Sequence, residues 1–234
     1  MGEFNLLIDL IRDFSFQTFI SFIFWVIAFL ISITVHEYAH GYTAWKMGDP
    51  TASAMGRLTL NPARHIDPIG FILLLIARFG WAKPVMINPR NFRNPKRGMV
   101  LSALAGPIAN IIMVIIGLII FGLINFLYYK NAAQASAFVE MALNFFYTFI
   151  YLNAVLAVFN LIPVPPLDGS RLANYFLPRK LSYYYNYIER YGFIILILAL
   201  YFLGLGRLLG FLAGLIISGI AYVLNFAPFL LFYK

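Results

Sequence analysis

Residues 15–40 read SFQTFISFIFWVIAFLISITVHEYAH, and this stretch decides what kind of fold the chain can adopt. Its first part, residues 15–35, contains no ionisable side chain. About 20 such residues suffice to cross the hydrocarbon core of a bilayer as a helix. The helical pattern continues through HEYAH, residues 36–40, because the first stop signal is Gly-Asp-Pro at 48–50. The stretch therefore predicts a spanning helix that carries ionisable side chains near its end.

The composition of the whole chain also indicates a membrane protein. Of its 234 residues, 62% are hydrophobic and 11% are charged. Soluble domains are about 45–50% apolar and about 25% charged. The chain has no cysteine, which excludes disulfides and thiolate metal ligands. Its net charge of +8 is spread over loops between apolar runs, so we expect contact with lipid headgroups and no nucleic-acid partner.

Further apolar runs follow along the chain. Residues 99–129 and 137–162 are each long enough to span a membrane, and the runs at 191–203 and 208–233 form a C-terminal pair. The run within 68–80 is too short to span, which favours a re-entrant or buried segment. We therefore expect an all-α polytopic membrane protein with about five or six transmembrane or re-entrant segments.

Two segments differ from the apolar runs. Residues 51–67 are polar, and the alternation in 54–60 predicts a small β-hairpin or an extended loop near the active site. Residues 1–14 have the spacing of a short amphipathic helix that lies on the membrane surface. We expect one membrane-embedded domain over residues 1–234, with a surface segment at 1–14, a catalytic core at 15–190 and a helical pair at 191–234.

The basic residues predict which side of the membrane each loop faces. Thirteen of the 17 lysines and arginines lie in two segments, residues 46–97 and 171–190. With the expected spans, both segments fall on the same side of the membrane. The positive-inside rule makes that side cytoplasmic, so we expect the N-terminus outside, Lys234 inside and the active site near the cytoplasmic face.

The HEYAH segment has the spacing of a zinc site. His36 and His40 are four residues apart, so both imidazoles lie on one helix face and can reach one ion. Glu37 stands beside the first of them, where it can accept a proton from an attacking water and return it to the leaving amine. Ionisable side chains inside a membrane helix are costly and mark function by default. The segment predicts one Zn²⁺ per chain with Glu37 as the catalytic residue.

A catalytic zinc needs a third protein ligand and an open position. Asp168 is the candidate, in the stretch NLIPVPPLDG at residues 160–169. It follows the third expected span on the same side of the membrane as His40. The alternative is that Asp168 and Gly169 form an ordinary turn after a helix.

The paired motifs resemble those of the site-2 proteases, the intramembrane zinc metalloproteases. HEYAH and the proline-rich LDG stretch carry the resemblance, together with GPIAN at 106–110 and HIDPIG at 65–70. The resemblance implies His36, His40 and Asp168 as zinc ligands and Glu37 as the acid/base. It also implies regulated intramembrane proteolysis of single-span membrane proteins, in the compact prokaryotic branch that lacks PDZ and CBS domains.

Four further polar residues have more than one interpretation each. Asn110 and Asn160 could donate a hydrogen bond to the oxyanion of the reaction, or could join neighbouring helices. His65 and Asp67 could form a second metal site or support the metal ligands, but bonding to the loop backbone is the favoured interpretation.

Two other functions are compatible with ionisable groups in a membrane. One is a divalent-metal transporter, although transport paths usually distribute polar residues along several helices. The other is a non-catalytic scaffold that binds membrane helices. We expect a metalloendopeptidase in the prokaryotic cell membrane whose partners are the lipid bilayer and single-span substrates.

Overall fold

The computed structural model describes residues 15–77, 80–130 and 137–225, and within these the regular structure is helical. The surface helix expected at residues 1–14 and the chain end at Lys234 lie outside the described residues. In chain order the elements are α2 (Phe16–Lys46), α3 (Thr51–Ala54), η1 (Pro62–Arg64), α4 (Pro68–Ala77), η2 (Pro89–Asn91), α5 (Pro95–Lys130), α6 (Ala137–Asn160), α7 (Asp168–Phe176), α8 (Arg179–Ile188), η3 (Glu189–Tyr191), α9 (Gly192–Phe202) and α10 (Leu205–Val223).

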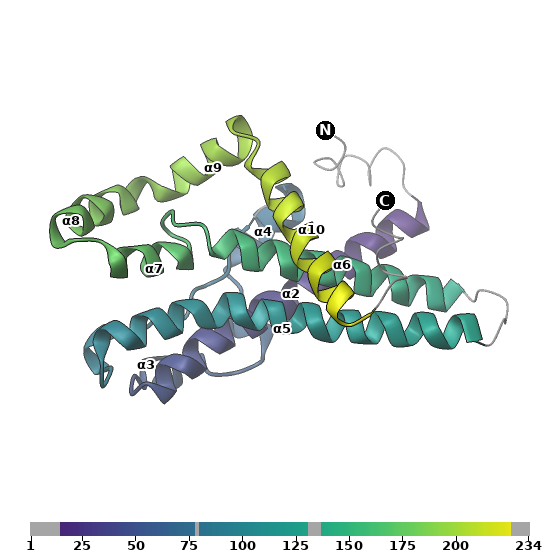
Figure 1. Ribbon diagram of the computed structural model, residues 1–234, viewed down its shortest axis with the longest axis horizontal. Helices are drawn as coiled ribbons and strands as arrows, with labels where there is room; N and C mark the ends of the chain where they lie inside the picture. The colour runs from purple at the N-terminus through teal and green to yellow at the C-terminus, as the bar shows by residue number, and fades with distance from the viewer. Residues whose placement is uncertain (1–14, 78–79, 131–136, 226–234) are drawn as a thin grey trace.

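Four of the described helices are long and apolar enough to cross a membrane: α2, α5, α6 and α10. Helices α2, α5 and α6 lie side by side along the long axis of the molecule, and α10 crosses them obliquely (Figure 1). Their outward faces expose many large apolar side chains, as expected for contact with lipid. The chain is therefore a multi-pass integral membrane protein.

Small residues let α10 pack closely on α5 and α6. The buried core between these three helices contains both bulky and small side chains. Its members are Val114, Leu118, Phe121, Ile150, Ala154, Ala213, Ile217 and Ala221. Small residues at helix interfaces are typical of membrane bundles, where close van der Waals contact replaces the hydrophobic driving force.

The predicted number of segments needs correction. The five or six transmembrane or re-entrant segments become four candidate spans within the described residues. Helices α4 and α9 are apolar, but with 10 and 11 residues they cover only about half of a bilayer core. The C-terminal pair forms α9 and α10, joined at Gly204, whose φ of 62° is the left-handed conformation that glycine adopts without strain.

The predicted β-hairpin at 51–67 is not observed in the described structure. Helix α3, bends and η1 occupy this segment instead. Local turn chemistry explains the difference, because the side chain of Asn61 caps η1 by accepting a hydrogen bond from the Ala63 N–H at 3.1 Å. Pro62 follows Asn61 and has no N–H to donate to a strand. In the described parts, the only β-bridge joins Ile66 to Ala82.

The loop that follows α4 is held to the rest of the protein at three points. The Lys83 N–H donates to the His65 carbonyl at 2.8 Å. The Val85 N–H donates to Glu37 at 2.8 Å. The Asn88 N–H donates to Asp49 at 2.7 Å. The segment from 80 to 88 is thereby fixed against the end of α2.

The basic segments lie at one end of the bundle. Helix α2 ends, α5 begins and α6 ends at this end, where α3, α7 and α8 also lie (Figure 1). This arrangement agrees with the predicted parity of the spans.

Candidate metal centre

The two histidines of HEYAH lie one turn apart on the buried face of α2. Their rings have centroids 4.5 Å apart and are nearly perpendicular, at 82°. Their Nε2 atoms are separated by 2.9 Å. Residues i and i+4 share a helix face, so α2 alone brings these two nitrogen atoms together.

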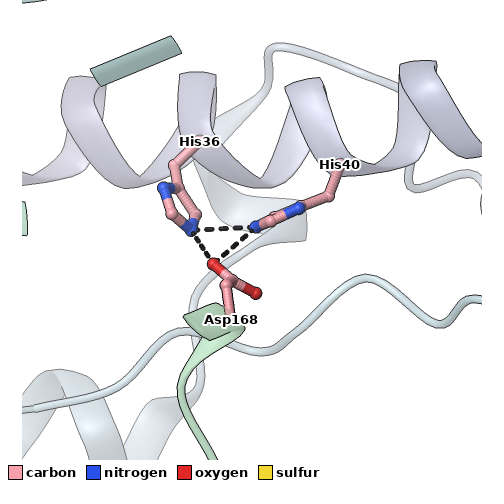
Figure 2. Close-up of side chains that lie close together, drawn as sticks. All are labelled: His36, His40 and Asp168. Atoms are coloured by element: carbon pink, nitrogen blue, oxygen red, sulfur yellow. Dashed lines mark hydrogen bonds and ion pairs between the residues drawn. The ribbon is translucent and has the colours of Figure 1, made fainter. Parts of the chain in front are cut away.

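Asp168 approaches the same point from the other side. It is the first residue of α7, and its Oδ2 lies 3.1 Å from Nε2 of His36 and 3.0 Å from Nε2 of His40 (Figure 2). The chain turns back after α6, and Gly169 packs against the Leu161 carbonyl so closely that a side chain there would not fit. The loop after α6 therefore delivers the carboxylate to the α2 histidines.

The hydrogen bonds at the Nδ1 atoms of the histidines determine which ring nitrogen carries the proton. The other nitrogen, Nε2, then directs a lone pair toward Asp168. Nδ1 of His40 lies 2.6 Å from the Ser102 carbonyl oxygen, which only accepts. Nδ1 of His36 lies 2.6 Å from Oδ1 of Asn110. Both Nδ1 atoms therefore carry the proton, and in a neutral imidazole the Nε2 atom is then an acceptor.

The site is therefore suited to a cation. Two imidazole lone pairs and a carboxylate oxygen converge within about 3 Å and have no proton to share. These three ligand atoms can contact one ion at the 2.0–2.2 Å distances of zinc–nitrogen and zinc–oxygen bonds. Two histidines and one carboxylate are also a common ligand set of catalytic zinc. The donor set thus fits the metal that the sequence predicts.

A cavity of about 520 Å³ opens beside these three residues. Its walls are mostly apolar and come from α2, the 80–85 loop, the end of α6, the start of α7 and Leu196 of α9. Glu37, Asn160 and Arg171 add polar groups to the lining. A mostly apolar cavity with a few converging polar groups is the usual form of a substrate site.

Glu37 lies on the cavity wall and is buried. Its Oε2 accepts the hydrogen bond from the backbone N–H of Val85, which holds the carboxylate in one orientation. The 80–85 loop therefore both lines the cavity and positions the predicted catalytic residue.

The other polar candidates have different positions. Asn110 is fully buried and does not line the cavity. Its amide bonds to His36 and to Asn153. This geometry favours a supporting role over direct contact with an oxyanion. Asn160 does line the cavity, and its Nδ2 donates to the Leu156 carbonyl at 3.0 Å.

His65 bonds to the loop backbone, and Asp67 bonds to the backbone of the first turn of α4. Nε2 of His65 lies 2.8 Å from the Thr59 carbonyl oxygen, and Oδ1 of Asp67 accepts the Gly70 N–H at 2.9 Å. Neither residue belongs to the cluster of possible ligands among the described residues.

Several residues at the centre were not singled out from the sequence. Asn153 lies within an expected span, so the criterion that selects Asn110 and Asn160 would also have found it. Ser102 and Val85 act through backbone atoms, which no residue type reveals.

Comparison with known proteins identifies the family. The profile of peptidase family M50 matches residues 122–200. A Bacillus subtilis protein named "Putative zinc metalloprotease YwhC" is 44% identical over 170 residues, which cover 73% of this chain and 76% of the relative. The chain belongs to peptidase family M50.

Other M50 relatives are more distant. The Mycolicibacterium smegmatis protein "Putative zinc metalloprotease Rip2" is 29% identical over 82% of this chain and 71% of the relative. "Zinc metalloprotease MJ0392" of Methanocaldococcus jannaschii is 27% identical over 69% of this chain and 37% of the relative. No solved structure matches the chain.

Membership of M50, the site-2 protease family, confirms the predicted enzyme class and cofactor. The chain is a zinc metalloprotease with several membrane helices.

Proposed function

We propose that this M50 member is an intramembrane zinc endopeptidase that hydrolyses peptide bonds in the membrane-spanning segments of other proteins. His36, His40 and Asp168 are its metal ligands, and Glu37 is its general acid/base. One observation carries the proposal: the ligand atom of Asp168 meets those of His36 and His40 at the buried face of a candidate spanning helix, on the wall of a mostly apolar cavity.

The residues of the cavity have separable tasks in hydrolysis. A zinc ion held by His36, His40 and Asp168 would supply Lewis-acid activation of water and of the substrate carbonyl. Glu37, held by the Val85 N–H, takes the proton of the attacking water and returns it to the leaving amine. Asn160 lines the cavity, and we propose that its Nδ2 group, which donates to the Leu156 carbonyl in this structure, turns to donate to the oxyanion of the reaction.

The apolar walls favour a membrane segment as the substrate. Phe29, Ile33, Leu156, Phe159 and Leu196 line the cavity and match apolar side chains. The substrates that we propose are single-span membrane proteins, cleaved within the bilayer or at its edge as a regulatory step.

The basic segments favour a location near the cytoplasmic face of a prokaryotic cell membrane. His36 lies ten residues before the end of α2, about 15 Å along the helix, which supports a centre below the membrane surface on that side.

The alternatives are less well supported. Membership of a metalloprotease family and the position of Glu37 on the cavity wall favour hydrolysis over metal transport or a non-catalytic scaffold.

The test compares the wild type with Glu37→Gln in purified, reconstituted form. Zinc content is measured by elemental analysis, and cleavage of a single-span substrate is followed by mass spectrometry. We expect about one zinc per chain in both proteins and at least a ~100-fold loss of cleavage in the variant. The scissile bond should lie in or beside the spanning segment of the substrate.

Glu140→Gln is the matched control, because Glu140 is exposed near the start of α6 and is far from the cavity lining. It should cleave like the wild type. Undiminished cleavage by Glu37→Gln would overturn the assignment of the acid/base, and a wild type without zinc would overturn the proposed site.

A further inference from the structure

A chain of buried polar side chains connects the metal centre to the interior of the bundle. It runs from Ser32 on α2 through Asn153 on α6 and Asn110 on α5 to His36. Three of these residues are 0% exposed and His36 is 3% exposed. Polar groups buried among membrane helices are costly unless each is hydrogen-bonded, and here each is.

Two backbone carbonyls determine the direction of every bond in the chain. Nδ2 of Asn153 donates to the Phe149 carbonyl at 2.8 Å. Because a carbonyl only accepts, the Oδ1 of Asn153 must face the other way, toward Asn110. Nδ2 of Asn110 donates to that oxygen at 2.8 Å, which turns the Oδ1 of Asn110 toward His36.

The hydrogen bonds of Ser32, at the beginning of the chain, agree with this direction. The Ser32 hydroxyl donates to the Ala28 carbonyl at 2.6 Å. Its oxygen is therefore available to accept the second N–H of the Asn153 amide, at 2.8 Å. A reversed amide at Asn153 would place its oxygen against the Phe149 carbonyl and leave Asn110 without an acceptor.

We propose that Asn153, acting through Asn110, is a positioning residue that holds His36 in the tautomer with a proton on Nδ1. This tautomer presents the Nε2 lone pair to the metal. The inference rests on the proposed zinc site. It concerns only His36, because His40 has its own backbone acceptor at Ser102. Partners behind a metal-binding histidine typically change metal affinity about 10- to 100-fold.

The alternative is that the asparagines only join helices. Substitutions at Asn110 distinguish this structural role from the positioning role. In Asn110→Asp, a carboxylate oxygen still accepts from Nδ1 of His36, but the second oxygen faces the Oδ1 of Asn153. This variant should unfold at a lower temperature and still retain zinc like the wild type. In Asn110→Leu the acceptor is lost, so zinc should leave about 10- to 100-fold faster.

Asn153 is tested in two backgrounds. In the wild type, Asn153→Leu frees the Asn110 amide to rotate, and zinc should leave up to about 10-fold faster. In the Asn110→Asp background, the same substitution should have no further effect on zinc release, because both carboxylate oxygens accept. This non-additivity is the signature of one residue acting through the other.

The experiment measures the rate at which excess chelator removes zinc from the purified full-length holoenzyme, with the unfolding temperature of each variant. Asn125→Leu is the matched control: Asn125 is a second buried asparagine of α5, far along the helix from the centre. It should release zinc like the wild type.

Zinc release at the wild-type rate from both Asn110→Leu and Asn153→Leu would overturn the positioning role. The positioning role would also be overturned if zinc release became faster in proportion to the loss of unfolding temperature in every variant, Asn110→Asp and Asn125→Leu included. A wild type that holds no zinc would instead refute the proposed site itself, so the two failures are distinguishable.

Discussion

The backbone of Gly106 on α5 lies directly against the imidazole of His40 on α2. A methyl group at position 106 would be 2.4 Å from Nε2 of His40 and 2.5 Å from Cε1 of His36. Both distances are far below van der Waals contact. Helix α5 can therefore pack against the Nε2 edges of both histidines only because residue 106 has no side chain. Among the small residues of this helix, Gly106 thus does more than allow close helix packing.

Gly106→Ala should disable the metal centre. Both imidazoles must move to accommodate the methyl group, so we expect at least a ~10-fold loss of zinc affinity and a parallel loss of cleavage. Zinc content and circular dichroism of the purified variant check this. Gly219→Ala is the control, since nothing lies within 4 Å of the added atom. A Gly106→Ala enzyme with wild-type zinc content and cleavage would contradict the prediction.

Val85→Pro should slow hydrolysis and leave zinc in place. Proline has no N–H, so Glu37 loses the hydrogen bond of 2.8 Å that orients it. A hydrogen bond to a charged group contributes about 1.5–3 kcal/mol, which corresponds to a roughly 10- to 100-fold lower kcat/KM.

Val85→Ala separates the backbone from the side chain at this position, because alanine keeps the N–H. It should cleave much faster than Val85→Pro at equal zinc content. Equal kcat/KM for the two variants would show that the N–H has no catalytic importance.

Single cysteines test the orientation in the membrane, and the chain contains no cysteine of its own. We expect Arg90→Cys and Lys180→Cys to react with an impermeant maleimide only after cells are permeabilised. Ala137→Cys, at the opposite end of the bundle, should react in intact cells. All three positions are exposed. The reverse pattern would place the basic segments outside and refute the predicted topology.

Asp49 should make the stability of the protein depend on acidic pH. Burial alone raises the pKa of this carboxyl, but hydrogen bonds from Thr51, Asn91 and Asn88 outweigh burial and hold the pKa below its usual value. The carboxylate therefore stabilises the fold fully above the unfolded pKa of about 3.9, and this contribution is lost as the pH falls through the lower folded value.

Asp49→Asn replaces one accepting carboxylate oxygen with an NH₂ group that faces the donors of Thr51, Asn88 and Asn91. The lost hydrogen bond should lower the free energy of unfolding by about 1–3 kcal/mol at neutral pH. The difference in unfolding temperature between wild type and variant should be large at pH 7 and shrink below about pH 4. The exposed Glu140→Gln variant should follow the wild type at every pH. A difference that does not change with pH would show that the charge of Asp49 is unimportant.

The sequence by itself determined the class of protein, its long helices and the chemistry of HEYAH. Apolar runs of sufficient length leave the backbone no alternative to helices in a bilayer. The spacing of His36 and His40 is a property of one helix, so their shared face follows without knowledge of the fold. The β-hairpin predicted within 51–67 is wrong, because Asn61 and Pro62 favour a capped turn over a strand.

Only the tertiary structure decided how the centre is completed. It brings Asp168 to the α2 histidines across 128 residues of sequence, and it separates Asn110, which lies behind His36, from Asn160, which faces the cavity. It also shows Asn153 within the polar chain and the Val85 N–H against Glu37. These relationships depend on which helix faces meet and on the direction of each hydrogen bond. Both are set by contacts between segments that are distant in the chain, so the residues of one segment do not determine them.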